Sequence, residues 1–348
     1  MSGSKHRNVG VSEGDGDMTY AVEAIGLTKY YGSFLAVDHI GFQVKKGEIF
    51  GFLGPNGAGK TTTIRMLTGV STPTDGTASI MDYDIVKQSV EAKALMGIVS
   101  DVSNVYDELS AWDNLVFTGN LYGVPKRRLE NKAEALLKRF GLYDRRSEKV
   151  RGFSRGMKRK VCIAMALVND SEVFFLDEPT SGLDVESVRE IRQMVRALNE
   201  EGLTVFLTTH NLEEANQMCD RIAIMNRGKI AAIDTPERLR QIMHNVQSVE
   251  VSFKEAPMNL PEELQQMGAV SSVEKHGDKY RIFTNEPPLV LKEVWDYAEK
   301  HGLVPISINT LGPSLEDVFV KLTGREMEEE LIRGGRATAQ NMSRGEMR

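Results

Sequence analysis

The stretch Gly54-Pro55-Asn56-Gly57-Ala58-Gly59-Lys60-Thr61 decides the fold of this chain. It follows the β-like run GEIFGFL and precedes the helix-like run TTTIRMLTG, which is the context of a phosphate-binding loop. In such a loop the glycines let backbone amides wrap phosphate oxygens, Lys60 reaches the β- and γ-phosphates, and the Thr61 hydroxyl can bind Mg²⁺. We therefore expect nucleotide to be bound by Gly54, Pro55, Asn56, Gly57, Ala58, Gly59, Lys60, Thr61 and Thr62.

A second group of metal-binding and catalytic side chains is expected at the ends of two further strands. The apolar run Val173–Leu176 ends in Asp177 and Glu178, and the run TVFLTTH ends in His210. Because strand ends of an open α/β sheet converge on one ligand crevice, these side chains should face the phosphate loop. Asp177 can hold Mg²⁺, Glu178 can polarise the water that attacks the γ-phosphate, and His210 can orient Glu178. We expect Lys60, Glu178 and His210 to be the catalytic residues.

The stretch FSRGMKRK, residues 153–160, has the features of a second phosphate-binding element. Ser154 is a favoured N-cap residue, and Gly156 would leave the amides of the first helical turn uncovered. Exposed amides at the positive end of a helix dipole suit a phosphate, and the apolar-rich run VCIAMALV that follows can bury the body of the helix. On this pattern alone an ordinary helix cap remains the alternative.

The composition is that of a soluble globular protein of roughly two domains. The chain has 348 residues, 41% hydrophobic and 26% charged, and no apolar run approaches the ~18 residues that span a bilayer. The formal charge of -6 argues against nucleic acid as the main ligand, and the basic run at residues 126–128 is expected to be a solvated face. The only two cysteines, Cys162 and Cys219, make a disulfide framework improbable and favour a reducing cytosol.

The order of apolar runs predicts an α/β domain over residues 18–235. A stretch that reads as helix at about 102–169 lies between two predicted strands, so we expect an inserted helical subdomain. Residues 236–324 follow a βαββαβ order that predicts a small ferredoxin-like α+β domain, ending in the helix SLEDVFVKLTG. Residues 1–17 are expected to be a disordered extension and residues 325–348 a charged tail that frays.

At this point the order of motifs resembles the ATP-binding cassette family, the nucleotide-binding subunits of ABC transporters. The resemblance covers about residues 20–235. FSRGM stands in the place of the family's LSGGQ signature, with Phe, Arg and Met for Leu, Gly and Gln, and it retains Ser154 and Gly156. The run VFFLDE matches Walker B, SGLD ending in Asp184 matches the D-loop, and His210 matches the switch histidine.

The resemblance implies a P-loop NTPase cassette that binds ATP with Mg²⁺ and hydrolyses ATP. Tyr31 would stack on adenine, with Tyr30 as the alternative. Two such cassettes meet head to tail, so Ser154, Gly156 and Asp184 of one copy would contact the nucleotide held by the phosphate loop of another. With one cassette per chain, a homodimer is implied.

The C-terminal unit is similar to the accessory domain on cassettes of drug, sodium and polysaccharide exporters. The first hypothesis is therefore the ATPase subunit of an exporter, bound at the cytoplasmic face of the membrane through a separate permease. The second is a soluble ABC ATPase that acts on a macromolecular complex. A nucleotide-binding regulator without turnover is disfavoured because Lys60, Asp177, Glu178 and His210 are all present. Substrate and transport direction cannot be read from the residues.

One position departs clearly from the family pattern, because Asp101 stands where the Q-loop glutamine is usual. As a hard oxygen donor, Asp101 is a third candidate metal ligand beside Thr61 and Asp177. The alternative is that Asp101 only caps the following turn, with Ser103 or Asn104 nearby. The permease groove is expected near residues 102–115, where Tyr106 and Trp112 could pack a helix of the partner or belong to the core.

Overall fold

The strand before the phosphate loop, β3 (Ile49–Leu53), lies inside a largely parallel sheet of order β10-β9-β3-β8-β7-β6. The computed structural model describes residues 20–102, 104–242 and 247–324, so the expectations for residues 1–17 and 325–348 lie outside the described residues. β3 and β7 are buried along their whole length, as expected for strands covered on both faces. The remaining strands of this sheet are β6 (Met96–Val99), β7 (Val173–Asp177), β8 (Thr204–Thr209), β9 (Arg221–Asn226) and, antiparallel at one edge, β10 (Lys229–Asp234).

A second, antiparallel sheet of order β2-β1-β4-β5 covers one face of the first, and the sequence analysis did not predict it. Helix α1 (Lys60–Leu67) contacts strands of both sheets. A cluster of aromatic rings holds the two sheets together, with Phe42 from the second sheet 5.0 Å from Phe52 of the first. The strands of the second sheet are β1 (Tyr20–Tyr31), β2 (Phe34–Lys45), β4 (Asp75–Ile80) and β5 (Tyr83–Asp84).

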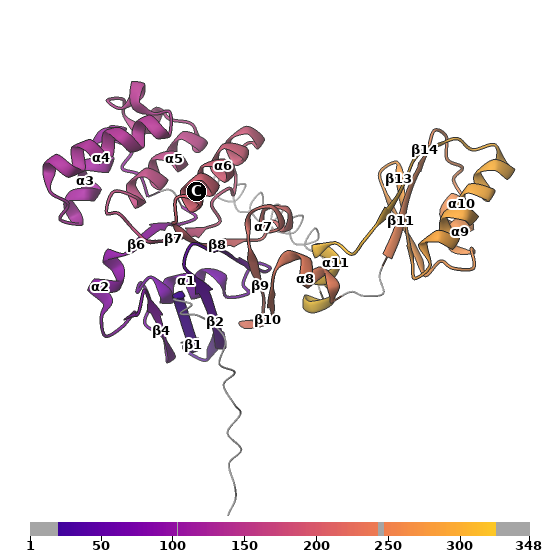
Figure 1. Cartoon of the computed structure of the whole chain (residues 1–348), viewed down its shortest axis with the longest axis horizontal. Coiled ribbons are helices and arrows are strands. Elements are labelled where there is room, and N and C mark those ends of the chain that lie inside the picture. The colour runs from indigo at the N-terminus through magenta and orange to yellow at the C-terminus, as the bar shows by residue number, and fades with distance from the viewer. Residues whose placement is uncertain (1–19, 103, 243–246, 325–348) are drawn as a thin grey trace, which may run out of the picture.

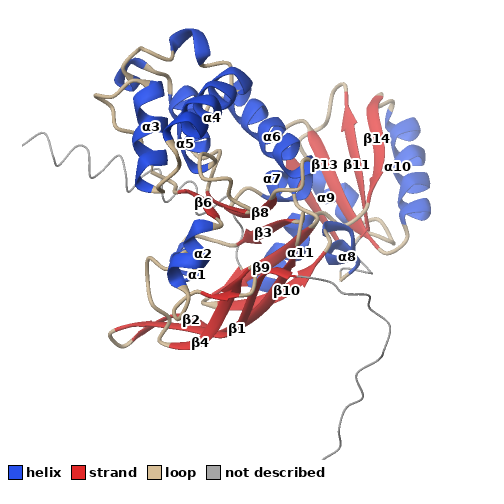
Figure 2. Ribbon diagram, turned by 60° about the vertical axis from the view of Figure 1, so that its left-hand side comes forward, coloured by secondary structure: helices blue, strands red, loops and turns tan. Residues whose placement is uncertain are grey.

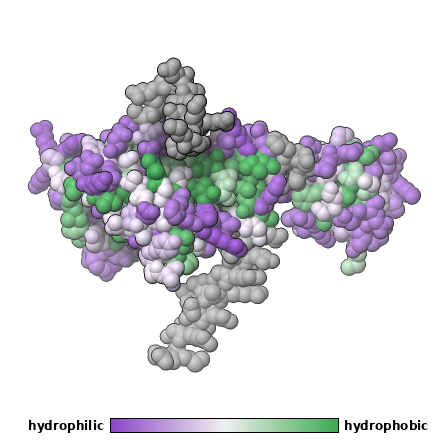
Figure 3. Space-filling view, turned by 90° about the horizontal axis from the view of Figure 1, so that it is seen from below, coloured by the Kyte–Doolittle hydropathy of each residue, from purple (hydrophilic) through white to green (hydrophobic). Residues whose placement is uncertain are grey.

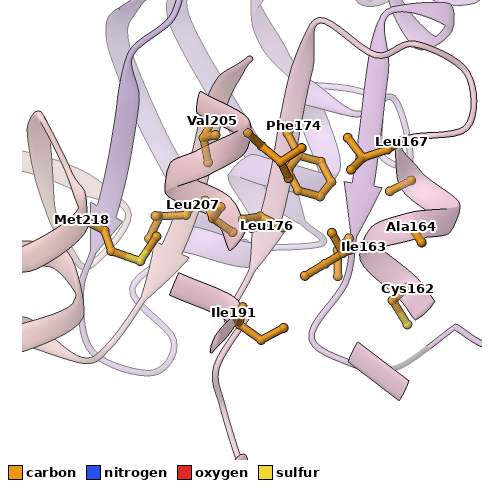
Figure 4. Close-up of a cluster of buried hydrophobic side chains, with 14 of the residues drawn as sticks. Cys162, Ile163, Ala164, Leu167, Phe174, Leu176, Ile191, Val205, Leu207 and Met218 are labelled. Atoms are coloured by element: carbon orange, nitrogen blue, oxygen red, sulfur yellow. The ribbon is translucent and has the colours of Figure 1, made fainter. Parts of the chain in front are cut away.

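Helices cover the other face of the parallel sheet. Figure 4 shows Ile163 of α5, Leu167 directly after α5, Ile191 of α6 and the strand residue Phe174 turned into this shared core. The segment predicted to be helical at about 102–169 contains helices α3, α4 and α5 joined by turns and short 3-10 helices, so it is less continuous than expected. The helices of this face are α3 (Ala111–Leu121), α4 (Lys126–Arg139), η1 (Tyr143–Arg145), η2 (Val150–Gly152), α5 (Arg155–Ala166), α6 (Val185–Glu200) and α7 (Leu212–Met218). Helix α2 (Ser89–Ala94) lies on the opposite side, where Ala92 is buried with the antiparallel sheet.

A small unit, residues 247–311, stands to one side of these layers (Figure 1). Its elements follow in the predicted order, and its antiparallel sheet has the order β12-β13-β11-β14. Both of its helices pack on one face of that sheet, where Leu264 and Val294 meet Val251 and Ile282 (Figure 2). The elements are β11 (Gln247–Phe253), α9 (Leu260–Gln265), β12 (Ser272–His276), β13 (Lys279–Thr284), α10 (Pro287–His301) and β14 (Pro305–Leu311).

The helices on either side of the small unit belong to the core of the large unit, which we define as residues 20–242 with α11. Leu239 of α8 (Pro236–Gln241) and Phe319 of α11 (Leu315–Thr323) are buried in the same cluster as the parallel sheet. The sequence analysis assigned both helices to the domain at 236–324. A local apolar pattern shows that a helix must be buried, but it does not show against which core.

The polarity of the surface is that expected from the composition. On the face shown in Figure 3, hydrophilic residues predominate over the small unit at the right-hand end. Nowhere in the described ranges is there a helix with the length and apolar character needed to cross a membrane. The basic run at Lys126, Arg127 and Arg128 is exposed, as expected for a solvated face.

Candidate active site

The phosphate loop forms a tight turn between β3 and α1. The amide of Ala58 donates to the Pro55 carbonyl at 3.1 Å, which closes the turn. Gly59, which precedes the first residue of α1, has a φ of 110°, and a Cβ there would lie 2.7 Å from the Ala36 carbonyl oxygen. Only glycine fits this position without strain. Beside the loop is a cleft of about 450 Å³, lined among others by Pro55, Asn56, Gly57, Ala58, Gly59, Lys60, Thr61 and Thr62.

The Lys60 ammonium is buried next to this loop. Its Nζ donates to the Gly54 carbonyl at 2.6 Å and to the Pro55 carbonyl at 3.3 Å. The same atom lies 3.6 Å from Glu178 Oε1. A buried cation placed between backbone carbonyls and a carboxylate can turn to a phosphate when one enters the cleft.

Thr61 and Asp177 are the residues that could hold a divalent cation. The Thr61 hydroxyl donates to Asp177 Oδ1 at 3.3 Å, and the Thr208 hydroxyl donates to the same oxygen at 2.5 Å. The described residues contain no cluster of three or more His, Cys, Asp or Glu side chains that could hold a metal by themselves. This arrangement fits Mg²⁺, which usually takes one or two carboxylate or hydroxyl ligands and completes its shell with phosphates and water.

Glu178 and His210 form a direct pair above Lys60. His210 Nδ1 lies 2.6 Å from Glu178 Oε2, and this hydrogen bond is the main cause that raises the pKa of His210 above its ordinary value. The backbone of Glu178 has a φ of 49°, and its amide donates to the carbonyl of Thr208. The turn thus directs the carboxylate away from the end of β7 and toward the cleft. Thr208, which was not predicted to belong to the site, supports both Asp177 and Glu178.

Asp101, the second residue after β6, lines the cleft. Burial, followed by the negative charge of Asp177, raises the pKa of its carboxyl group. The side-chain hydrogen bonds of the turn itself come from Ser100, which donates to the Val102 carbonyl at 2.9 Å, and Asn104, which donates to Ser100 Oγ at 2.7 Å. The alternative capping partner Ser103 lies outside the described residues.

Aromatic residues line the outer part of the cleft. Tyr31 is a lining residue with an exposed fraction of 46%, and the Lys29 ammonium lies 5.3 Å from the centre of its ring. Tyr30, the alternative, does not line the cleft, and its amide is bonded to Thr74 Oγ1. Phe34 also lines the cleft and is 65% exposed, although the sequence analysis did not name it. Its position in the YYGSF run beside Tyr31 was the available signal.

The residues of the FSRGM stretch lie outside this cleft. Ser154 is the N-cap of α5, and its hydroxyl accepts from the Met157 amide at 3.2 Å. Gly156 is buried, and a Cβ there would lie 2.2 Å from the hydroxyl oxygen of Ser187 in α6. The prediction that Gly156 leaves amides uncovered is therefore incomplete, because its missing side chain also allows α6 to approach.

Asp184 also lies outside the cleft, at the N-terminus of α6. Its carboxylate accepts from the amide and hydroxyl of Ser187 at 2.9 and 2.8 Å, and these hydrogen bonds lower its pKa. Arg155 Nη1 donates to the Gly182 carbonyl at 3.3 Å. We call Ser154, Gly156 and Asp184 the signature group. Ser181 of the same loop does line the cleft, which the sequence analysis did not foresee.

The two aromatic residues expected at a partner groove have different environments. Tyr106 is 49% exposed, and its ring packs edge-on against Phe117 with centroids 5.0 Å apart. Trp112 is partly buried and packs against the main hydrophobic core. Tyr106 therefore belongs to the surface and Trp112 chiefly to the core.

Comparison with known proteins gives a consistent result. A family model described as ABC transporter matches residues 37–181. The chain is 34% identical over 310 residues to the linearmycin resistance ATP-binding protein LnrL of Bacillus subtilis (strain 168), covering 88% of this chain and 100% of that protein. It is also 34% identical over 309 residues to the Nod factor export ATP-binding protein I of Rhizobium sp. (strain N33), covering 89% of this chain and 99% of that protein.

Solved structures agree with the sequence relatives. The ATP binding subunit of an ABC transporter superposes with a TM-score of 0.59 at 28% identity, covering 64% of this chain and 93% of that chain. The cbiO1 protein of Clostridium perfringens, described as part of an ABC transporter complex, superposes with a TM-score of 0.59 at 25% identity, covering 65% of this chain and 95% of that chain.

Proposed function

Because the chain belongs to the family of ABC transporter ATP-binding proteins, and is thus an ATPase, we propose that it powers an exporter as a pair of copies bound to a separate permease. The observation that carries this proposal is the cleft, where Lys60, Glu178 and His210 come together from different elements, and where the lining residue Thr61 contacts Asp177. These residues supply a phosphate-binding cation, metal ligands, a general base and a group that orients the base.

Each residue around the cleft has a chemical task. Glu178 accepts a proton from the water that attacks the γ-phosphate, and His210 fixes the direction of that carboxylate. Lys60 exchanges the loop carbonyls for phosphate oxygens. Mg²⁺, held by Thr61 and Asp177 with Asp101 as a further ligand, would neutralise charge on the phosphates. Tyr31 packs on the adenine ring.

The signature group supports the proposal of a pair. Ser154, Gly156 and Asp184 are also assigned to nucleotide, but none of them lines the cleft of its own chain. Gly54 is likewise absent from the lining, although its carbonyl accepts from Lys60 beside the cleft. In a head-to-tail pair, α5 of one copy would bring its N-terminal amides to the γ-phosphate in the cleft of the other. ATP would then favour the closed pair, and hydrolysis would remove the shared contact.

The exporter proposal follows from relatives and from the small unit. The relatives are named for linearmycin resistance and for Nod factor export, and they are matched over nearly their whole length. The element order of residues 247–311 and the sheet order β12-β13-β11-β14 support a ferredoxin-like accessory domain. We place the chain at the cytoplasmic face of the membrane, where the permease would hold it.

A surface next to Asp101 suits the permease. Val102 is 74% exposed, Tyr106 is 49% exposed and Leu121 is 70% exposed, and they lie near a small cavity lined by Ile98, Ser100, Asn104 and Tyr122. Exposed apolar side chains around a concave surface are typical of a protein-binding site. We name Val102, Tyr106, Phe117 and Leu121 the apolar rim, and we propose that it receives a helix of the permease.

Purification from detergent-solubilised membranes tests this proposal. The native chain should retain one integral membrane protein, identified by mass spectrometry, and Tyr106→Asp should lose that partner while binding ATP normally. Val90→Asp is the matched control, because Val90 is 77% exposed on α2 and does not belong to the apolar rim. Copurification with ribosomal or other soluble complexes in place of a membrane protein would favour the alternative function.

A further inference from the structure

Arg159 lies in the middle of the basic run MKRK, yet it is only 3% exposed. Its Nη1 donates to the Ser100 carbonyl at 2.7 Å and its Nη2 donates to the Asp101 carbonyl at 2.8 Å. Its Nε is buried and has no hydrogen-bond partner among the described residues. Arg159 therefore joins the second turn of α5 to the turn that carries Asp101.

The energetics of this contact indicate that Arg159 fixes the position of the two carbonyls and does not merely fill space. Burying a guanidinium is strongly unfavourable unless its donors are satisfied, so an arginine is a poor choice for filling space. Two parallel charge-assisted hydrogen bonds fix both the distance and the orientation of the group they bind. A lysine would offer a single point charge without the planar fork. The two carbonyls are thus held in one geometry relative to α5.

The neighbouring cations of α5 contact other parts of the molecule. Lys158 pairs with Asp107 at 2.6 Å, and Lys160 pairs with Glu190 of α6 at 2.9 Å. Of these three consecutive cations, Arg159 is the one that holds the turn beside the cleft. This difference supplies a matched control on the same helix.

From these contacts we propose that Arg159 is a positioning residue that transmits nucleotide occupancy of the cleft to the orientation of α5. Asp101 lines the cleft on one side of the contact, and Ser154 caps α5 on the other. When Asp101 moves to meet nucleotide and metal, its carbonyl draws the guanidinium, and α5 moves with it. The proposal rests on the proposed binding of ATP in the cleft.

The signature helix would then report the nucleotide of its own chain to the site of the second copy. Two sites linked in this way should respond cooperatively, because each copy would present α5 correctly only when its own cleft is filled. The apolar rim begins at Val102, directly after Asp101, so the same contact would also affect the surface proposed for the permease.

Amide hydrogen exchange in the Ser154→Arg background isolates the contact within one chain. That variant should block closure of the pair, so any effect of ATP and Mg²⁺ on α5 must pass through the chain itself. We expect ATP to slow exchange in residues 155–166 when Arg159 is present. With Arg159→Met added, that change should be lost, while ATP still slows exchange in the phosphate loop.

The controls separate transmission from stability. Lys160→Met removes one ion pair of α5 and should keep the ATP response, and Arg159→Lys should recover only part of it. Persistence of the full response in Arg159→Met, or equal loss in Lys160→Met, would overturn the proposal. If ATP fails to slow exchange in the phosphate loop itself, ATP binding in the cleft, and thus the proposed function, is what has failed.

Discussion

The cleft and the signature group differ in completeness, although both consist of residues predicted to bind the same nucleotide. In the cleft, Lys60, Glu178 and His210 are already joined by contacts of 3.6 and 2.6 Å. In the signature group, Ser154 and Asp184 are satisfied by caps of their own helices. The side chains of the first region surround an open cleft. Those of the second region cap the N-termini of α5 and α6.

This difference indicates which part of a complete site a second copy would have to supply. A phosphate entering the cleft finds a cation, a carboxylate and a set of backbone amides in place. The signature group lies on closely packed helices, because Gly156 lets α6 approach α5 and Arg155 donates to the Gly182 carbonyl. Because Ser154, Gly156 and Asp184 do not line the cleft of their own chain, we expect them to close a site on another molecule.

Mixing two inactive variants is the strongest way to break this comparison. Ser154→Arg should abolish ATPase activity, because it places bulk and charge where the facing phosphate must sit. Lys60→Ala should abolish it by removing the cation of the cleft. Mixed pairs contain one intact site, with the cleft from the first variant and the signature group from the second, so activity should return in a steady-state assay. No recovery at any ratio would argue against exchange between chains.

The substitution Glu178→Gln tests the cleft alone. The amide keeps the shape of the carboxylate but cannot accept the proton of the attacking water, so turnover should fall by roughly 10²–10⁴-fold. ATP binding should remain, and the ATP-bound pair should accumulate in sizing chromatography with ATP and Mg²⁺. A variant that hydrolyses ATP at the wild-type rate, or that stays monomeric with ATP, would contradict the assigned base.

The smallest expected effect concerns Asp101, which lies between the two regions. As a hard ligand it should help to hold the cation, so Asp101→Gln should raise the Mg²⁺ concentration that gives half-maximal activity. Asp101→Ala should raise that concentration and also lower the maximal rate, because no oxygen remains. A metal titration of ATPase activity measures both quantities. Unchanged curves for both variants would leave Asp101 as a turn residue.

The sequence predicted those parts of the molecule that follow local rules. The strand and loop at Ile49–Thr61 and the acid pair after β7 could be located because buried strands and glycine turns have strong patterns. Ser154 could be assigned as a cap for the same reason, and the structure confirms that cap.

The remainder depended on contacts between distant segments. Phe34 reaches the cleft through the bend between β1 and β2, and the antiparallel sheet forms through pairings that no local pattern specifies. Arg159 lies between two lysines in the run MKRK, and nothing in that run distinguishes a buried cation from a solvated one. Arg159 is buried because β6 ends beside α5, so that the carbonyls of Ser100 and Asp101 can accept its hydrogen bonds.

The position of α11 has a consequence for how this chain can be shortened or recombined. The small unit is inserted between α8 and α11. A chain cut after α8 would lose Leu315, Val318 and Phe319 and would expose the apolar core residues of the large unit that they cover. Removing residues 247–311 and rejoining the ends would instead keep α11 packed on the core of the large unit. The small unit could therefore be removed or replaced without exposing the core of the large unit, whereas α11 has to be kept.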